Sequence, residues 1–290
     1  MTIATLLHPI PVGDFLDQYF FKRPFARKGG AEPYVALGDW PMIERLLTAT
    51  NLDILVASNR LGSYAGSNPG NLNEAQALLA AGYTIGFRHV QRFDDAYARV
   101  AADFASDFCA TTDIHLYCTP AGEKGFGWHY DAEEVFVLQT QGSKNWSLRK
   151  NTVNPWPLIE TLPDNMAYER EIMPLIRCQI QAGDWLYVPG GYWHQTEAGE
   201  ASISLSIGLT CSSGIDVYDL LRDQLLRDLR WRERLPVAGL ASSLTQEELI
   251  NQYRLRFTEL AIDLGKHFSS DQNVQHFLTQ QPRNDVGHSA

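Results

Sequence analysis

The chain has 290 residues, of which 44% are hydrophobic and 20% charged, a composition typical of a globular protein with one large domain and a smaller one. Its 24 Lys and Arg against 34 Asp and Glu give a net charge of −10, so we expect no direct binding to nucleic-acid backbones, which requires clustered positive charge. A basic protein or peptide remains compatible with this charge as a partner.

The first hundred residues predict short helices separated by turns. Apolar residues recur at helical spacing in residues 14–21 and 40–49, and residues 73–81 are rich in Ala and Leu. Residues 93–108 form the best early helix candidate, because their apolar residues fall on one stripe. Between these helices, the composition of residues 62–70 is that of a loop.

From Asp113 the spacing changes from helical to alternating. Residues 113–119 alternate polar and apolar side chains, residues 135–139 are a mostly apolar run, and residues 185–188 end at a Pro-Gly-Gly turn. Residues 202–209 place Ser202, Ser204 and Ser206 on one face and Ile or Leu on the other. Many short strands with turn signals predict an antiparallel sandwich or barrel. The serine row fits a wall that faces a polar cavity.

After Gly214 the spacing is helical again. Asp216 is expected to cap a helix that ends near Arg234, and residues 245–248 form a capping-box pattern that opens a second helix to about Leu264. A short third helix is expected over residues 273–278. The first helix carries a leucine stripe, Leu220, Leu221, Leu225 and Leu229. We therefore predict a domain of residues 1–214 and a helical region of residues 215–290 that packs on the first domain or on a second copy of itself.

Targeting signals and disulfides are not evident. The first residues lack the basic region and long apolar core of a signal peptide, and no run approaches the roughly 18 apolar residues of a membrane span. The four cysteines are widely spaced, without a Cys-x-x-Cys pair, and are Cys109, Cys118, Cys178 and Cys211. We expect reduced thiols in a cytoplasmic protein that has no membrane partner.

Two segments carry residues that can bind a metal. Gly-Trp-His129-Tyr-Asp131 places a histidine and an aspartate two residues apart, and on an extended segment these side chains point the same way. Val-Pro-Gly-Gly-Tyr-Trp-His194 supplies a second histidine, which must come from a different strand. Two imidazoles and one carboxylate are the facial triad of non-haem Fe(II) sites, which leaves three positions open for a co-substrate and O2. A lone His-x-Asp pattern is more often a surface or structural pair.

Two nearby features have alternative interpretations. Glu133 and Glu134 follow the metal motif and would either attract a basic target or form a solvated surface pair, and the second interpretation is favoured. His115 shares a strand face with Tyr117 and would either line a cavity or be a hydrogen-bonded core histidine, and again the second is favoured.

Residues 114–149 and 183–194 closely resemble the core of JmjC-type, cupin-fold 2-oxoglutarate oxygenases of the ribosomal-oxygenase-like branch. Residues 20–25, Phe-Phe-Lys-Arg-Pro-Phe, resemble the N-terminal signature of that branch. The resemblance implies a mostly β fold with a double-stranded β-helix (jelly-roll) core, helical N-terminal additions and a C-terminal helical unit. It also implies Fe(II) on His129, Asp131 and His194.

The resemblance assigns further residues to the co-substrate, 2-oxoglutarate. Lys144 would bind its distal carboxylate, although by itself it would be an ordinary turn lysine after Gly142. Tyr117 would hydrogen-bond the same carboxylate, or it would be a core tyrosine. On the last strand Ser206 or Thr210 would supply a hydroxyl, but Gly208 occupies the nearest equivalent position.

The implied function is Fe(II)- and 2-oxoglutarate-dependent hydroxylation of an amino-acid side chain in a protein or peptide. The alternatives are a small-molecule hydroxylase with the same site and a cupin that binds a metal without oxidation. The branch carries a helical dimerisation region followed by a winged-helix domain. The roughly 75 residues after the barrel suffice for the helices, which would allow a homodimer, and are too few for both parts. We therefore expect the winged helix to be missing or reduced.

Overall fold

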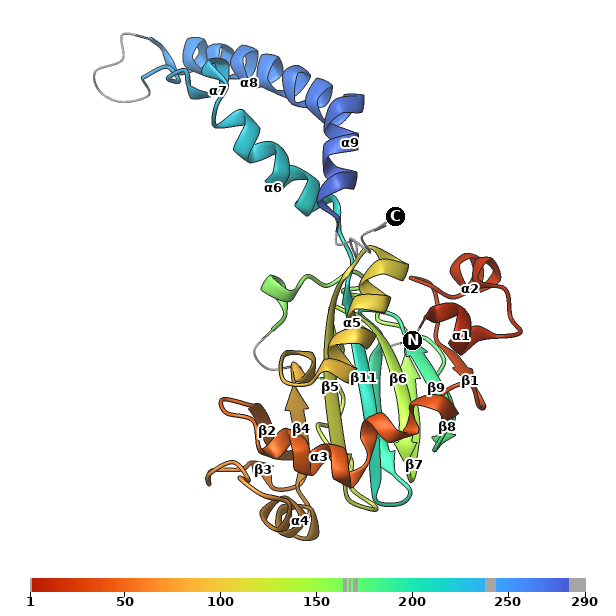
Figure 1. Cartoon of the computed structure of the whole chain (residues 1–290). Coiled ribbons are helices and arrows are strands. Elements are labelled where there is room, and N and C mark those ends of the chain that lie inside the picture. Colours follow the sequence, from red (N-terminus) through yellow and green to blue (C-terminus); the bar gives the residue numbers. More distant parts are fainter. Residues whose placement is uncertain (1, 164–165, 167, 169–171, 238–243, 282–290) are drawn as a thin grey trace. The chain divides into compact units, whose positions relative to one another are not determined.

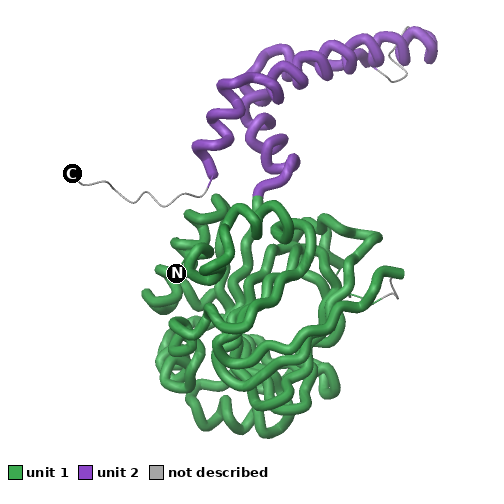
Figure 2. The backbone as a smooth tube through the Cα atoms, turned by 90° about the vertical axis from the view of Figure 1, so that its right-hand side faces the viewer, with its two compact units in different colours: residues 1–211, 283–290 green, residues 212–282 purple. Residues whose placement is uncertain are grey.

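A computed structural model describes residues 2–163, 166, 168, 172–237 and 244–281. The chain forms two compact units, one reaching to Cys211 and one beginning at Ser212 (Figure 2). The division lies close to the domain boundary expected after residue 214. The assignment of the two units as an oxygenase domain and a dimerisation region stays a prediction.

The first unit is built on two antiparallel sheets (Figure 1). The large sheet consists, in spatial order, of β1 (Phe25–Arg27), β9 (Trp185–Val188), β6 (Glu134–Gln141), β11 (Ser202–Thr210), β5 (Thr111–Thr119), β4 (Thr84–Arg88), β2 (Asp53–Ser58) and β3 (Gly62–Ser63). The small sheet consists of β10 (Trp193–Ala198), β7 (Ser143–Arg149) and β8 (Ile176–Gln181). The strands expected around residues 113–119, 135–139, 185–188 and 202–209 are all present.

The alternation of β11 separates two cores. Ile203, Leu205, Ile207 and Leu209 join the main apolar core on one face of the large sheet, which also contains residues of the helices. On the other face Val135, Val137 and Leu186 pack with residues of the small sheet in a second, smaller core. The serines of β11 face this second side, between the two sheets, as their spacing predicts. The polar face of the strand therefore lines an interior rather than solvent.

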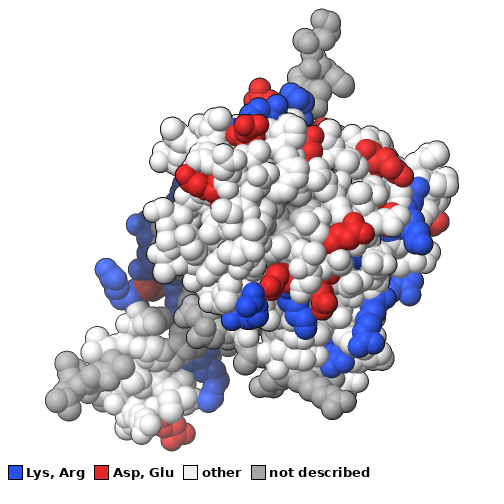
Figure 3. All heavy atoms as spheres, turned by 90° about the horizontal axis from the view of Figure 1, so that it is seen from below, with Lys and Arg blue, Asp and Glu red and all other residues white. Residues whose placement is uncertain are grey.

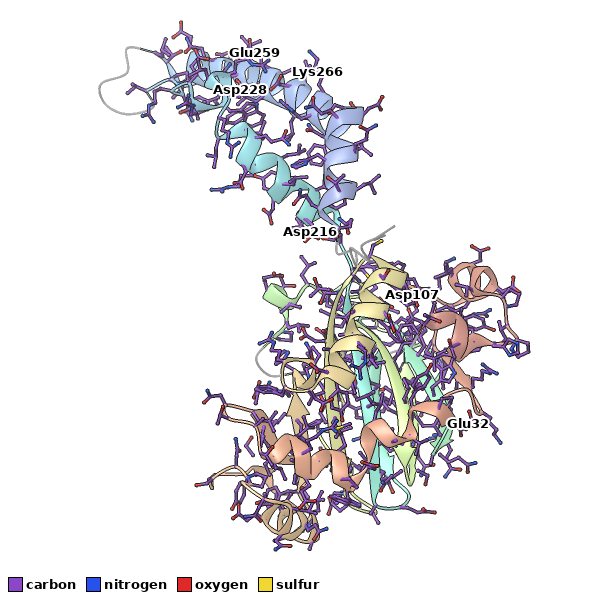
Figure 4. All side chains as sticks on the ribbon, viewed as in Figure 1. Glu32, Asp107, Asp216, Asp228, Glu259 and Lys266 are labelled. Carbon is purple, nitrogen blue, oxygen red and sulfur yellow. The ribbon has the colours of Figure 1, made fainter. Side chains whose placement is uncertain are left out.

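Several short helices cover the large sheet. They are α1 (Ile3–Leu7), α2 (Val12–Gln18), α3 (Trp40–Leu47), α4 (Leu72–Ala80) and α5 (Asp95–Phe108), with 3-10 turns η1 (Glu32–Gly38), η2 (Val90–Arg92) and η3 (Ile159–Thr161). Helix α5 begins two residues later than expected because the Asp94 side chain caps it. Asp107 of α5 accepts a hydrogen bond from the Ile3 N–H (2.7 Å), which ties α1 to α5 (Figure 4).

Two of the early predictions need correction. The helix expected over residues 14–21 spans Val12–Gln18 and ends before Phe21, whose φ of 59° is left-handed and incompatible with a continuing helix. The loop expected over residues 62–70 begins with β3, which pairs with β2. Strands β2 and β4 have no counterpart among the predicted elements, because short apolar runs do not by themselves distinguish a strand from a buried helix segment.

The second unit is helical and consists of α6 (Gly214–Leu225), α7 (Leu229–Arg232), α8 (Gln246–Phe268) and α9 (Asp271–Gln280). Ser213, not Asp216, is the N-cap of α6. Asp216 is the third helical residue, and its carboxylate accepts the Ser213 N–H at 2.6 Å. The single helix expected to Arg234 is broken, because the Asp228 side chain caps a new helix, α7 (Figure 4). The capping box at Thr245 is confirmed, and α8 extends to Phe268.

The leucine stripe of α6 is divided by this break. Leu221 and Leu225 are buried, at 1% and 7% exposed, whereas Leu229 is 74% exposed. Asp263 of α8 accepts hydrogen bonds from Trp231 and Arg230 of α7, at 2.8 Å each. These contacts connect α7 to α8 within the second unit. Arg230 forms ion pairs with both Asp228 and Asp263, so these three residues form an ion cluster within the unit.

The turn at Gly142 passes the chain from the large sheet to the small one, between β6 and β7. Its φ is +63°, and a Cβ there would lie 2.3 Å from the backbone carbonyl oxygen of Ala201. We expect Gly142→Ala to lower the free energy of unfolding by about 2–4 kcal/mol, through strain at a left-handed position and displaced backbone. Urea unfolding would measure this change. Gly13→Ala is the matched control, since nothing lies within 4 Å of its Cβ position. Equal stability of both variants would contradict the assignment of Gly142 as an obligatory turn.

Acidic and basic side chains are interspersed, with neutral areas between them, on the face shown in Figure 3. Across the described part of the chain, none of the helices has the combination of length and apolar character needed to cross a membrane.

Candidate metal centre

Backbone pairing brings the three predicted ligands together. The His129 N–H donates to the His194 carbonyl (3.1 Å) and the His194 N–H donates to the His129 carbonyl (2.7 Å). Two residues further along, the Gly191 N–H donates to the Asp131 carbonyl at 2.7 Å. The segment before β6 and the start of β10 thus lie side by side. The Pro-Gly-Gly turn is what allows β10 to return along the metal motif.

The three side chains converge as the facial-triad interpretation requires. Candidate ligand atoms of His129, Asp131 and His194 all lie within 4.8 Å of one another. His194 Nε2 is 3.5 Å from an Asp131 oxygen, and the two imidazole centroids are 4.2 Å apart. Their Nδ1 atoms lie 3.0 Å from the carbonyls of Gly127 and Tyr192, respectively. If each Nδ1 carries the proton, each Nε2 is left with a free lone pair for a metal.

His194 is held in the uncharged form that metal ligation requires. It is 6% exposed, and burial, followed by the neighbouring His129, lowers the pKa of His194 to about 4. A neutral imidazole needs no proton to leave before it can bind a divalent cation.

One cavity adjoins the triad and is lined by residues of both sheets. Its polar lining includes Lys144, Tyr117, Thr84, Trp146, Ser204 and Ser206. Apolar side chains of Val135, Val137 and Val188 complete the wall. All three residues predicted to contact a co-substrate, Lys144, Tyr117 and Ser206, therefore line the cavity that also contains the metal ligands. Thr210, the alternative to Ser206, is exposed at the end of β11.

Lys144 is a buried ammonium group without a counter-ion. It is 5% exposed, and its Nζ donates one hydrogen bond, to Ser204 Oγ at 2.8 Å. Within the described residues it forms no ion pair, and burial lowers the pKa of Lys144 to about 8. A lysine nitrogen has three donors, so two are unused. This arrangement differs from that of an ordinary turn lysine, which would extend into solvent.

Two further polar atoms in the cavity lack partners. Thr84 Oγ1 and Trp146 Nε1 are buried and make no hydrogen bond in the described structure. Trp146 lies two residues after Lys144 on β7 and its ring centroid is 5.8 Å from that of His194. Buried polar groups are rarely left unsatisfied, so these atoms indicate space for a polar ligand. The Lys-x-Trp spacing in the sequence could have identified Trp146 as a cavity residue.

Tyr117 fits its position because Gly86 has no side chain. A Cβ on Gly86, the register partner of Tyr117 on β4, would lie 2.8 Å from the Tyr117 ring. Burial raises the pKa of Tyr117 well above its ordinary value, so the phenol keeps its proton and remains a hydrogen-bond donor.

The interpretation of Glu133 and Glu134 as a solvated pair is wrong. Glu134 is 5% exposed and accepts hydrogen bonds from the Tyr187 hydroxyl and from the Gly190 N–H (3.0 Å), so it fixes the Pro-Gly-Gly turn. Burial raises its pKa to about 6. Burial and then the charges of Asp131 and Asp113 raise the pKa of Glu133 to about 7. The sequence could have indicated this for Glu133, because it follows Asp131 by two residues and residues two apart on an extended segment point the same way.

His115 is hydrogen-bonded, as the favoured interpretation expects. Its Nδ1 accepts the His89 N–H at 3.1 Å, and burial, followed by the charge of His89, lowers the pKa of His115 to about 4. His89 in turn pairs with Asp113 at 2.7 Å. This network links β5, which carries His115 and Asp113, to the residue after β4.

The model of the JmjC domain family matches residues 87–217, which include all three ligands and the whole cavity strand β11. Residues 87–217 of this chain thus resemble a JmjC domain. The matched segment begins in β4 and ends in α6, and the predicted resemblance to JmjC-type proteins and the predicted fold class are confirmed. In solved structures, the E. coli ribosomal oxygenase YcfD has the same fold, with a TM-score of 0.59 and 19% identity over 92% of this chain and 69% of that chain. A second YcfD structure, described as a complex with cobalt and 2-oxoglutarate, has a TM-score of 0.54 and 20% identity over 95% and 72%.

Curated relatives of the JmjC domain are larger proteins. The chain is 27% identical over 215 residues to the bifunctional lysine-specific demethylase and histidyl-hydroxylase NO66 of Aedes aegypti, covering 71% of this chain and 34% of that protein. It is 35% identical over 130 residues to ribosomal oxygenase 2 of Mus musculus, covering 45% and 27%. The chain thus spans about a third to a half of the length of the NO66 relatives it matches.

Proposed function

We propose that this protein is an Fe(II)- and 2-oxoglutarate-dependent dioxygenase that hydroxylates an amino-acid side chain in a protein or peptide. One observation carries the proposal: two neutral imidazoles and a carboxylate converge beside a buried lysine that has no counter-ion. The names of the relatives, a histidyl-hydroxylase and a ribosomal oxygenase, support a protein substrate.

The residues of the site fit both Fe(II) and 2-oxoglutarate. Two nitrogens and one carboxylate oxygen on one side of a site are a donor set suited to non-haem Fe(II), with open positions for other ligands. The cavity beside it offers an unpaired ammonium on Lys144 and the unpartnered polar atoms of Thr84 and Trp146. A carboxylate at Lys144 would supply the missing counter-charge. The YcfD structure described as a complex with cobalt and 2-oxoglutarate supports the same pairing of ligands here.

The protein's own residues would bind the iron, orient the co-substrate and exclude water. His129, Asp131 and His194 would hold the iron, which supplies the activation of O2 when bound. Lys144 would hold the distal carboxylate of 2-oxoglutarate, with Ser204 fixing the ammonium and Tyr117 donating from its protonated phenol. Ser206 lines the same cavity and would contact the co-substrate from β11. The valines of the cavity wall limit the access of bulk water.

Turnover of 2-oxoglutarate without a substrate tests this proposal. We expect the purified protein to convert 2-oxoglutarate slowly to succinate in the presence of Fe(II) and O2, and mass spectrometry or NMR would detect the succinate. The same assay with a candidate peptide should add one oxygen to the peptide. A protein that binds Fe(II) but produces no succinate under any condition would instead be a metal-binding cupin.

The C-terminal unit supports a homodimer. Helix α8 has no buried residue, and Ile250, Phe257 and Ile262 are 48%, 54% and 58% exposed. A groove on this helix is lined by Leu249, Ile250, Tyr253, Phe257 and Ala261, at the spacing of one helix face. A 23-residue helix with exposed apolar residues of this size is typical of a helix that packs against a partner. The second copy of the chain is the partner that we propose.

We expect sedimentation to give about twice the 32.6 kDa of one chain. Phe257→Asp should convert the dimer to a monomer because it places a charge in the apolar row. Gln252→Asp, on an exposed polar position of the same helix, is the control and should remain dimeric. A wild-type monomer at micromolar concentrations would refute the homodimer.

The cysteines support a cytoplasmic location. Cys109, Cys118, Cys178 and Cys211 are all free, and three of them have pKa values raised by burial, to about 12, 11 and 12 for Cys118, Cys178 and Cys211. Thiols kept reduced and protonated are typical of a reducing compartment.

A further inference from the structure

A second cavity adjoins the one that contains the metal ligands. It lies between helices α3 and α4 and the adjoining ends of β5, β6 and β11 (Figure 1), and its volume is about 320 Å³. Pockets that bind small molecules measure roughly 300–1,000 Å³. Thr119 lines both cavities, whereas the three metal ligands and Lys144 line only the first. The second cavity is therefore a separate space that shares one wall residue with the candidate metal centre.

A bulge in the large sheet lies beside this cavity. The pairing of β11 with β6 shifts between Ile203 and Ser204, which leaves Thr140 of β6 without a register partner. The Thr140 hydroxyl instead donates to the Ile203 carbonyl at 2.8 Å. Bulges bend a strand and change the direction of the side chains next to them. The strand ends beyond the bulge, Gln141 of β6 and Ser202 of β11, both line the cavity.

Ser202 has a hydroxyl group that the protein itself leaves unused. The residue is 3% exposed, and its Oγ makes no hydrogen bond within the part of the chain that the structure describes. A serine hydroxyl can donate one hydrogen bond and accept two. Buried polar groups rarely lack every partner, because the loss of hydration is then uncompensated. A ligand with a hydroxyl group in this cavity would supply the missing partner.

The rest of the cavity wall is suited to an uncharged ring. None of the described residues that line it is charged, and most are apolar, among them Leu79 of α4, Pro120 and Ile203. Trp40 of α3 is half-buried and adds an aromatic side chain to the wall. A carboxylate or an ammonium that entered here would lose its hydration without gaining a counter-ion. A flat apolar ring, by contrast, can pack against an indole and aliphatic side chains.

From this combination we infer that the second cavity is a binding site for a small uncharged aromatic molecule that carries a hydroxyl group. The ring would pack against Trp40 and Leu79, and the hydroxyl group would form a hydrogen bond with Ser202 Oγ. The site uses neither the metal ligands nor Lys144, so the inference does not rest on the proposed oxygenase function.

Three probes of similar size test the chemistry of the site. They are benzyl alcohol, toluene, which lacks the hydroxyl group, and benzoate, which is charged. Saturation-transfer difference NMR on the full chain, without added metal, measures the affinity for each probe. We expect the wild type to bind both benzyl alcohol and toluene, and to bind benzoate at least about tenfold more weakly than benzyl alcohol, because the carboxylate has no counter-ion in the cavity.

Ser202→Ala separates the hydrogen bond from the apolar contacts. It should weaken the binding of benzyl alcohol by about threefold to tenfold and leave that of toluene within about twofold of the wild type. A merely structural effect of the substitution would change the affinities for both probes alike. The comparison of two probes in two proteins therefore isolates the contribution of the Ser202 hydroxyl group.

A second pair of variants locates the binding. Ala80 is an exposed residue of α4 that lines the cavity, and Ala80→Trp should weaken both aromatic probes by more than about tenfold by filling the space. Ala81→Trp is the matched control, because Ala81 is the exposed C-cap of the same helix and does not line the cavity. It should bind both probes as the wild type does.

Four results would overturn the inference. They are the absence of binding of both aromatic probes to the wild type, binding of benzoate as tight as that of benzyl alcohol, undiminished binding in Ala80→Trp, and an unchanged ratio of the benzyl alcohol and toluene affinities in Ser202→Ala.

Discussion

Asp131→Ala is expected to abolish the conversion of 2-oxoglutarate to succinate and to weaken Fe(II) binding by more than about a hundredfold. Loss of an outer-sphere partner already costs about 10- to 100-fold in metal affinity, and Asp131 is the only carboxylate of the triad. Without it, two neutral histidines would have to bind a divalent cation with no compensating charge. Isothermal titration with Fe(II) under anaerobic conditions would measure the affinity, and succinate formation would measure the activity.

The variant should remain folded, because 38% of the Asp131 side chain is exposed and its backbone carbonyl still accepts the Gly191 N–H. Asp53→Ala is a useful control, as it removes a partly exposed carboxylate that pairs with Arg88 outside the triad. Normal Fe(II) binding and full turnover in Asp131→Ala would refute its assignment as a ligand.

Lys144→Met is expected to stabilise the free protein and to weaken 2-oxoglutarate binding by about a hundredfold or more. The ammonium is buried with one neutral partner, and its pKa is lowered from 10.5 to about 8, which corresponds to a destabilisation of up to about 3 kcal/mol at neutral pH. Methionine has a similar shape without the charge. The loss of affinity follows because a carboxylate in this cavity would have no other cation among the lining residues.

The pH dependence gives this prediction a definite sign. Because the folded-state pKa lies below the unfolded value, the unfolded chain binds more protons between pH 8 and 10.5. Below about pH 8 the buried charge of Lys144 lowers the free energy of unfolding by its full amount. This destabilisation decreases as pH rises from about 8 and disappears near pH 10.5, so stability rises with pH over this window. Subtracting the urea-unfolding profile of Lys144→Met from that of the wild type isolates this contribution. A variant that is less stable at pH 7 and binds 2-oxoglutarate normally would contradict both parts.

The sequence was most informative where spacing has a simple geometric meaning. Two residues apart on an extended segment, His129 and Asp131 had to point the same way, and the Pro-Gly-Gly turn indicated where a second histidine could return. The strict alternation in β11 likewise predicted a polar wall. These inferences depend on the local period alone, and the structure places the three ligands, Ser204 and Ser206 at the cavity.

The sequence was least informative where burial depends on distant partners. Glu133 and Glu134 look like a surface pair, and only the approach of Gly208 from β11 and of Tyr187 from β9 shows that they lie inside. The cap at Ser213 and the break before Asp228 were missed for a related reason. Several residues there can cap a helix, and the apolar stripe continues across the break. Tertiary contacts decide between such alternatives, and these contacts cannot be predicted from the local pattern of one sequence.

Anaerobic titration of the Fe(II)-loaded protein with 2-oxoglutarate tests the central claim most directly. Chelation of ferrous iron by a 2-keto acid produces a visible charge-transfer absorption, so the signal requires both groups at one site. We expect a saturable band in the wild type, no band in His194→Ala, and a band that saturates only at much higher 2-oxoglutarate concentration in Lys144→Met. Absence of the band in the wild type, or an undiminished band in His194→Ala, would contradict a shared site built from the triad and Lys144.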